Sequence, residues 1–321
     1  MAKKNTKKTS WVSILGLGIS GYETALFLKR RGIPVFVSDS GSGKQVVRYA
    51  RALRKKGVSV EVGKHSLAKI ARSSSVVVSP GIPPRSPLIR WLRKRRVRLV
   101  SEIELAAQYC RGTIIAITGT NGKSTVTTLT AAVLQVAGYP AVACGNLGKP
   151  FISCIDGAAP ATCFVVEVSS FQLFYSRRFV PHVSVILNIR PDHLDWHRGM
   201  AEYTRSKIKM LKYQRKTDYA IVHAAVRPQL KTYHANTQVP VIAKKRKQIR
   251  IMRTASPCWR SPVFSASRGE RRNGYVGSFA DWNIGSNSSG GSAALRFTTI
   301  PRRRHRMRLP GHWICSPKTL F

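Results

Sequence analysis

Two short glycine-rich loops, each lying between an apolar run and a segment of helical pattern, constrain the fold of this chain most. The first loop, GLGISG at residues 16–21, follows the apolar residues 12–15. The second loop, TGTNGKST at residues 118–125, follows the apolar residues 113–117. A buried strand that turns sharply into a helix is the building unit of parallel α/β sheets. The chain is therefore predicted to be an α/β protein with one domain around each loop.

Apolar runs and helical segments continue to alternate after each loop. In the first domain the predicted strands are residues 12–15, 35–37, 58–62 and 76–78, and the predicted helices are residues 21–31 and 46–56. In the second domain the predicted strands are residues 113–117, 163–168, 183–187 and 219–222, and the predicted helix is residues 124–137. This order favours a Rossmann-like N-terminal domain at residues 1–111 and a second parallel α/β domain at residues 112–243.

Residues 244–321 differ in character from the rest of the chain. They contain 17 Lys+Arg and 2 Asp+Glu, and they include the stretch SNSSGGS at residues 286–292. Apolar residues show no sustained helical or strand period there. This composition predicts a basic tail that is irregular or disordered.

The charge of the chain is strongly basic, with 55 Lys+Arg against 13 Asp+Glu and a formal net charge of +42. Such a balance raises nucleic-acid binding as a hypothesis. However, the basic residues are scattered and are not interleaved with aromatic residues in a nucleic-acid-binding pattern. We therefore expect a solvated basic surface that binds nucleic acids only nonspecifically.

Cysteine usage and hydropathy indicate the compartment. The six cysteines form no C-x-x-C pair, which favours reduced thiols over a disulfide framework or a metal site. No apolar run approaches the roughly 20 residues needed to span a bilayer. The basic start of the chain is followed by a short apolar run that is better explained as a buried strand than as an export signal. A cytoplasmic protein without membrane association is expected.

The first loop has the pattern of a nucleotide site. Gly16, Gly18 and Gly21 permit a tight turn and let backbone N–H groups approach a phosphate at the start of a helix. Asp39 ends the second predicted strand, where a carboxylate commonly meets a ribose or a base. These residues predict a nucleotide or nucleotide-sugar site, although a plain glycine turn is the structural alternative. On these residues alone, NAD also remains open.

The second loop predicts ATP binding. Its N–H groups can surround phosphates, Lys123 can reach the outer phosphates, and the Ser124 hydroxyl can bind Mg²⁺. Ile117 stands where the first glycine of a full Walker A sequence would be. The predicted ATP-binding residues are Gly119, Thr120, Asn121, Gly122, Lys123, Ser124 and Thr125.

Four further motifs are SPGI at residues 79–82, GNLG at residues 145–148, EVSSFQL at residues 167–173 and NIRPDHLD at residues 188–195. These motifs resemble those of the Mur ligase family, in the branch that adds D-glutamate. Together with the two loops they occur in the family's order across residues 12–222, about two-thirds of the chain. The resemblance implies that Ser79, Asn146 and Ser169 contact the substrate, and that residues 112–243 are the central ATP-binding domain of such a ligase, in incomplete form.

The resemblance also implies metal and catalytic roles. Mg²⁺ would be held by Ser124, Glu167, His193 and Lys207, the last of these as a carbamate, and Lys123, His193 and Lys207 would be catalytic. A carboxylate at the end of a parallel strand, such as Glu167, is well placed for a metal. Without the resemblance, His193 would be interpreted as a packed or capping histidine and Lys207 as a solvated lysine.

The implied reaction is the ATP-dependent ligation of D-glutamate to UDP-N-acetylmuramoyl-L-alanine in peptidoglycan synthesis, by a monomer using ATP and Mg²⁺. An acyl phosphate of the UDP-linked substrate would be the intermediate. The alternatives are a nucleotide-binding module without turnover and a related ATP-dependent peptide ligase, such as a folylpolyglutamate synthase.

Family members carry a third domain that binds the incoming amino acid, and residues 244–321 do not resemble it. We expect this domain to be missing, because the C-terminal part is truncated or out of frame, with a diverged tail as the alternative. Its loss would remove the D-glutamate site, and we then expect at most slow, uncoupled ATP hydrolysis in the presence of the UDP-linked substrate, with no ligated product.

Overall fold

The computed structural model describes residues 11–230 and the backbone of residues 241 and 242. The predictions of an irregular tail at residues 244–321 and of a missing third domain concern residues outside the described part. Cys258 and Cys315 lie outside it as well. In the described part, Cys110, Cys144, Cys154 and Cys163 are free thiols. No helix there is both long and apolar enough to cross a bilayer.

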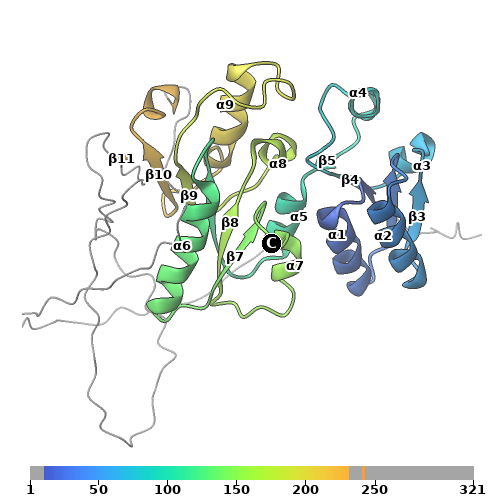
Figure 1. The fold of residues 1–321 in the computed structure, drawn as a ribbon, viewed down its shortest axis with the longest axis horizontal. Coiled ribbons are helices and arrows are strands. Elements are labelled where there is room, and N and C mark those ends of the chain that lie inside the picture. Colours follow the sequence, from blue (N-terminus) through green and yellow to red (C-terminus); the bar gives the residue numbers. More distant parts are fainter. Residues whose placement is uncertain (1–10, 231–240, 243–321) are drawn as a thin grey trace, which may run out of the picture. The chain divides into compact units, whose positions relative to one another are not determined.

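The first sheet is parallel and five-stranded, in the order β3-β2-β1-β4-β5 (Figure 1). Its strands are β1 (Val12–Leu15), β2 (Val35–Asp39), β3 (Ser59–Val62), β4 (Ser75–Val78) and β5 (Leu99–Val100). Its helices are α1 (Ile19–Arg30), α2 (Lys44–Lys55), α3 (Leu67–Ala71), α4 (Pro87–Lys94) and α5 (Glu102–Tyr109). Alternate strand residues face the two helical layers: Ile14 packs in the cluster with α1 and α2, and Leu15 packs with α3 and α4.

The second sheet is parallel and six-stranded among the described residues, in the order β11-β10-β9-β6-β8-β7. Its strands are β6 (Thr113–Thr118), β7 (Ala141–Gly145), β8 (Cys163–Glu167), β9 (Val183–Ile186), β10 (Tyr219–His223) and β11 (Val241–Ile242). Its helices are α6 (Lys123–Val136), α7 (Phe151–Cys154), α8 (Ser170–Tyr175) and α9 (Met200–Ile208), with 3-10 turns η1 (Lys209–Leu211) and η2 (Arg227–Leu230).

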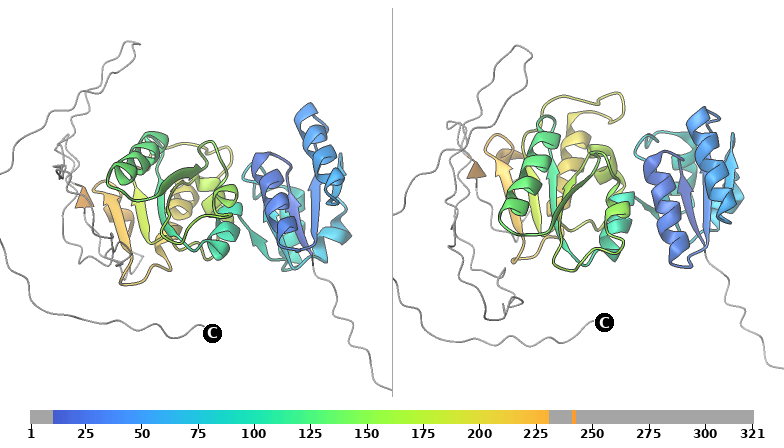
Figure 2. Two further views of the ribbon diagram at one scale, coloured as in Figure 1. Left: turned by 90° about the horizontal axis from the view of Figure 1, so that it is seen from below. Right: turned by 60° about the horizontal axis from the view of Figure 1, so that its bottom comes forward.

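Helices cover both faces of the second sheet (Figure 2). Ile115 and Ile117 of β6 pack with Ala131 of α6 on one face. Ile114 and Ala116 of the same strand belong to the larger cluster on the other face. Strands buried on both faces must be apolar along their whole length, and this explains why these strands were visible in the sequence.

Both sheets are parallel α/β sheets, as the two glycine loops predicted. Every strand predicted from the sequence is present, with ends that differ by one or two residues. The elements that were not predicted include the four-residue α7 and the six-residue α8, and also β7 and the longer helices α4, α5 and α9. The domain limits at residues 111 and 243 stay predictions.

Candidate functional site

The site lies at the carboxyl edge of the second sheet, where four strands end side by side. Ile117 of β6 is in register with Glu167 of β8, and Gly145 of β7 pairs with Glu167 from the other side. Thr118 of β6 pairs with Ile186 of β9. Ligands of open parallel sheets bind at this edge, at the point where the strand order reverses. The strand order reverses at β6, and the predicted ATP loop follows that strand.

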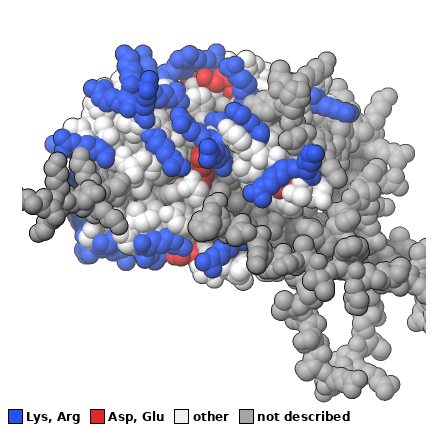
Figure 3. Space-filling model, turned by 180° about the vertical axis from the view of Figure 1, so that it is seen from behind, with Lys and Arg blue, Asp and Glu red and all other residues white. Residues whose placement is uncertain are grey.

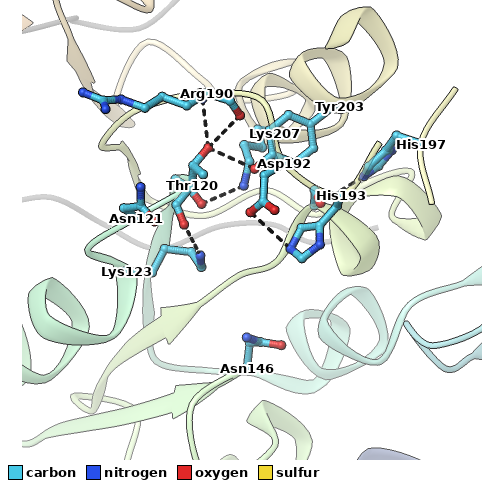
Figure 4. A network of polar contacts seen from close by, with 12 residues as sticks. Thr120, Asn121, Lys123, Asn146, Arg190, Asp192, His193, His197, Tyr203 and Lys207 are labelled. Atoms are coloured by element: carbon cyan, nitrogen blue, oxygen red, sulfur yellow. Dashed lines mark hydrogen bonds and ion pairs between the residues drawn. The ribbon is translucent and has the colours of Figure 1, made fainter. Parts of the chain in front are cut away.

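The loop between β6 and α6 is held by the segment that follows β9. The Asn188 side-chain oxygen accepts hydrogen bonds from the backbone N–H groups of Thr120, at 3.1 Å, and Asn121, at 2.9 Å. The Asn188 amide nitrogen donates to the Asn121 carbonyl at 3.0 Å. The Lys123 ammonium donates to the Thr120 carbonyl at 2.8 Å, so it lies over the loop (Figure 4). Ser124 and Thr125 are exposed at the start of α6.

Thr120 joins the loop to two further segments. Its hydroxyl accepts a hydrogen bond from the Arg190 N–H at 2.9 Å and lies 3.0 Å from the Tyr203 hydroxyl on α9. The sequence did not single out Asn188, Arg190 or Tyr203 as residues of the site. The motif at residues 188–195 included the first two, and only the folded chain shows that they support the loop.

Lys207 lies beneath the loop, on α9, with 2% of its surface exposed. Its ammonium donates to the Gly119 carbonyl at 2.8 Å and lies 4.7 Å from the centre of the Tyr203 ring. Burial first and the nearby Lys123 charge second lower the pKa of Lys207 to about 7, against the opposing effect of Asp192. The structure therefore brings the two predicted catalytic lysines into one electrostatic environment.

Glu167 is a buried carboxylate at the end of β8, with 3% of its surface exposed. One of its oxygens accepts from the Asn146 amide at 2.9 Å, and the other has no hydrogen-bond partner. Gly145 lets the ends of β7 and β8 lie close together, because its φ is +98° and an added Cβ would lie 2.4 Å from the Glu167 backbone carbonyl oxygen. A buried carboxylate oxygen without a partner is costly unless a cation meets it, so this atom fits a metal ligand.

His193 and Asp192 lie on the same side of the loop as Lys123, and Asn146 lies across from them (Figure 4). The His193 ring nitrogen is 3.4 Å from the Asp192 carboxylate, and the ring packs against Phe171 with centroids 4.7 Å apart. Within the described residues, no three His, Cys, Asp or Glu side chains converge as a metal site. The predicted metal set would thus need the Ser124 hydroxyl and a modified Lys207.

Ser169 has a structural role in the fold. It begins α8, where its hydroxyl accepts from the Gln172 N–H at 3.2 Å, while its own N–H donates to the Gln172 side-chain oxygen at 3.0 Å. This reciprocal pair is a capping box. A contact between Ser169 and a substrate stays a prediction.

The glycine loop of the first sheet lies against the residue that follows β4. An added Cβ at Gly16, whose φ is +94°, would be 2.5 Å from the Ser79 Cβ. An added Cβ at Gly21 would lie 2.1 Å from the Gly16 carbonyl oxygen, whereas an added Cβ at Gly18 would have no neighbour within 4 Å. The structure thus brings Gly16, Gly21 and Ser79 together for packing reasons and leaves the approach to Gly18 open.

Asp39 holds the loop through one carboxylate oxygen and the turn that follows β2 through the other. One accepts from the Leu17 N–H at 2.5 Å and the other from the Gly41 N–H at 2.6 Å. The carboxylate is therefore oriented by the backbone at the carboxyl edge of β1 and β2. Each oxygen retains a lone pair for a ligand hydroxyl or N–H.

Comparison with known families gives two matches. The description "Mur ligase MurD-like, N-terminal domain" fits residues 10–101, and "Mur ligase middle domain" fits residues 117–256. These two stretches contain the two glycine loops and the residues gathered at both sheet edges.

Similar proteins carry the name UDP-N-acetylmuramoylalanine–D-glutamate ligase. One from Koribacter versatilis is 42% identical over 217 residues, which cover 68% of this chain and 48% of that protein. Another from Acidobacterium capsulatum is 41% identical over 213 residues, covering 66% and 46%. The chain spans about half the length of these curated relatives.

Proposed function

Through its N-terminal and middle domains the chain belongs to the Mur ligase family, and from that premise we propose that it serves the ATP-dependent ligation of D-glutamate to UDP-N-acetylmuramoyl-L-alanine. The observation that carries this proposal is the position of Lys207. A carbamate needs a lysine whose amine is partly neutral, and Lys207 is buried against the ATP loop with a lowered pKa. A lysine on a solvated helix face would have neither property. A monomer in the cytoplasm is part of the same proposal.

The site residues divide the work on ATP. The N–H groups at the start of α6 and the Lys123 ammonium would hold the phosphates. Mg²⁺ would be held by the Ser124 hydroxyl, the free Glu167 oxygen, His193 and the Lys207 carbamate, and it would neutralise charge on the phosphates. Asn188 keeps the loop N–H groups in place, so the loop needs little rearrangement when phosphate arrives.

The UDP-linked substrate would use the first sheet and the second together. Its diphosphate would meet the N–H groups around Gly18, where the structure leaves space, and Asp39 would meet the uridine. Asn146 and Ser79 would guide the muramoyl part. The substrate carboxylate would then attack the γ-phosphate of ATP, giving ADP and an acyl phosphate, and the D-glutamate amine would displace phosphate to form the amide.

The test is an assay of the purified chain that follows phosphate release and UDP-muramoyl-dipeptide formation together. Formation of the dipeptide, dependent on D-glutamate, would demonstrate the complete reaction. Phosphate release without dipeptide would limit the proposal to acyl-phosphate formation. The absence of both would leave a nucleotide-binding module without turnover.

Lys123→Ala tests the proposed ATP site. Loss of its point charge should weaken ATP binding by about tenfold or more, equal to about 1.4 kcal/mol. Lys55→Ala, the same charge change on exposed α2, should leave ATP affinity unchanged.

Thermal stabilisation by UDP-N-acetylmuramoyl-L-alanine but not by NAD would support the assignment of the first loop, and the reverse pattern would overturn it.

A further inference from the structure

A cavity of about 900 Å³ lies on the side of α9 that faces away from the ATP loop. Tyr203 and Lys207, one turn apart on α9, face the loop through Thr120 and Gly119. Glu202, Arg205 and Ser206 line the cavity from another face of the same helix. The cavity is therefore distinct from the nucleotide site.

Six cationic side chains line this cavity, and they come from separate elements. They are Arg93 and Arg96 at the end of α4, Arg177 after α8, Arg205 on α9, and Lys209 and Lys212 in and after η1. Glu202 is the acidic residue of the lining. Its carboxylate accepts from the Arg198 N–H at 2.9 Å and lies 3.6 Å from His197. Within the part of the chain that the structure describes, none of the six cations forms an ion pair.

Two of these cationic side chains, Lys209 and Arg93, are held by contacts with neighbouring groups. The Lys209 ammonium donates to the carbonyls of Phe174, at 2.8 Å, and Leu173, at 3.3 Å. The Arg93 guanidinium lies 5.2 Å from the centre of the Phe174 ring. At Arg177 it is the backbone that is held, since its N–H donates to the buried Glu104 carboxylate at 2.6 Å, and this bond does not fix the guanidinium. Side chains that are already held lose little conformational entropy when they bind a ligand.

The basic lining needs an explanation beyond the general charge of the chain. Figure 3 shows Lys and Arg side chains scattered over the described part of one face, so a positive surface by itself marks no site. Here, however, the cations converge on a hollow. Lys209 interacts with the like charges of Arg93, Arg177 and Lys212, and the opposing carboxylates are Glu104 beside Lys209 and Glu202 in the lining. Like charges held together in a cavity raise its affinity for an anion that carries several negative charges.

We propose that this cavity binds a small oligophosphate anion, at a site separate from the nucleotide site. Its volume lies in the range of small-ligand pockets, and its arginines can donate paired hydrogen bonds to phosphate oxygens. Because α9 contributes to both sites, an anion in the cavity and a nucleotide at the loop would contact two faces of one helix. The proposal goes beyond the ligase reaction and does not depend on turnover.

The experiment is calorimetric titration of the full chain with inorganic tripolyphosphate near physiological salt. The Lys123→Ala background weakens competing binding at the ATP loop. We expect saturable binding with one site per chain. Arg93→Ala with Arg205→Ala should weaken it by about tenfold or more. The matched control, Arg48→Ala with Arg51→Ala on α2, removes the same charge elsewhere and should change affinity less than about twofold, because exposed charges beyond roughly 8 Å are screened.

Three results would overturn the proposal. The first is the absence of saturable binding, and the second is equal weakening by the two double variants, which would indicate the general charge of the surface. The third is binding of a single-stranded oligonucleotide that depends on Arg93 and Arg205 while tripolyphosphate does not bind. Arg205→Glu is a second variant that should not disturb folding, because Arg205 is exposed on α9. It should weaken binding by about tenfold or more, like the double variant, while leaving the thermal transition unchanged.

Discussion

At the scale of single residues, Lys207 joins a structural property to a chemical one. Carbamate formation requires a neutral amine, and an ordinary lysine is neutral in only about one molecule in 3000 at pH 7. Burial lowers the pKa of Lys207 to about 7, so that about half of the amines are neutral at that pH. Burial thus makes the modification accessible to this lysine among the many that the chain carries.

Formation of the Lys207 carbamate should therefore follow pH. At constant dissolved CO₂, the carbamate carbon seen by NMR with labelled bicarbonate should increase as the pH rises through about 7, because deprotonation supplies the reactive amine. Lys207→Met should abolish the signal, and Lys212→Ala should not. A signal that persists in Lys207→Met would assign the modification to another lysine.

Gly16 and Gly18 are a matched pair within one loop. Gly16→Ala places a Cβ 2.5 Å from the Ser79 Cβ at a φ of +94° and should lower the free energy of unfolding by about 1–3 kcal/mol. Gly18→Ala meets nothing within 4 Å and should change stability by less than about 0.5 kcal/mol. Its added methyl group should instead weaken binding of the UDP-linked substrate. Urea denaturation and calorimetry separate the two effects, and equal destabilisation by both changes would contradict this account.

At the scale of elements, the sequence predicted what is local and continuous. Buried parallel strands such as β6 and β8 are unbroken apolar runs, and the glycines mark where each turns toward a helix. Short elements gave no such signal: α7 has four residues, too few to show a helical period. The support of the ATP loop could not be predicted either, because Asn188 lies 67 residues from Asn121 in the chain.

The Asn188 side chain should control the geometry of the loop rather than the stability of the sheet. Asn188→Ala removes its hydrogen bonds to Thr120 and Asn121 and should weaken ATP binding by about tenfold, since loop N–H groups lose their orientation. Gln135→Ala is the control: it removes a 2.7 Å side-chain hydrogen bond to the Ala141 carbonyl at the other end of α6. Calorimetry should show unchanged ATP affinity for this control, and a loss equal to that of Asn188→Ala would refute the distinction.

At the scale of the whole described molecule, α5 ties the segments of the two sheets together. It follows β5 of the first sheet, and its Ser101 cap lies 2.6 Å from the hydroxyl of Ser176, which follows α8. Glu104 accepts from the N–H groups of Arg177 and Arg178. Glu102 accepts from the Ile152 N–H at 2.6 Å, while its second oxygen is buried without a partner. The connection therefore includes a carboxyl group that is poorly solvated when ionised.

Stability should accordingly depend on pH through Glu102. Burial raises its pKa from 4.5 to about 7, with the Ile152 hydrogen bond acting against the rise. Because the folded pKa is the higher one, the stability that the protonated group contributes is full below about pH 4.5 and is lost as the pH rises through about 7. The loss should reach about 3 kcal/mol near pH 8. Glu102→Gln retains the acceptor for Ile152 but cannot ionise, so it should match the wild type near pH 4.5 and exceed it in urea denaturation at pH 8. Other groups titrate equally in both proteins, so the difference in free energy of unfolding between Glu102→Gln and the wild type isolates Glu102. If that difference stays constant from pH 4.5 to 8, the carboxyl group is already ionised at pH 4.5 or is not buried in solution.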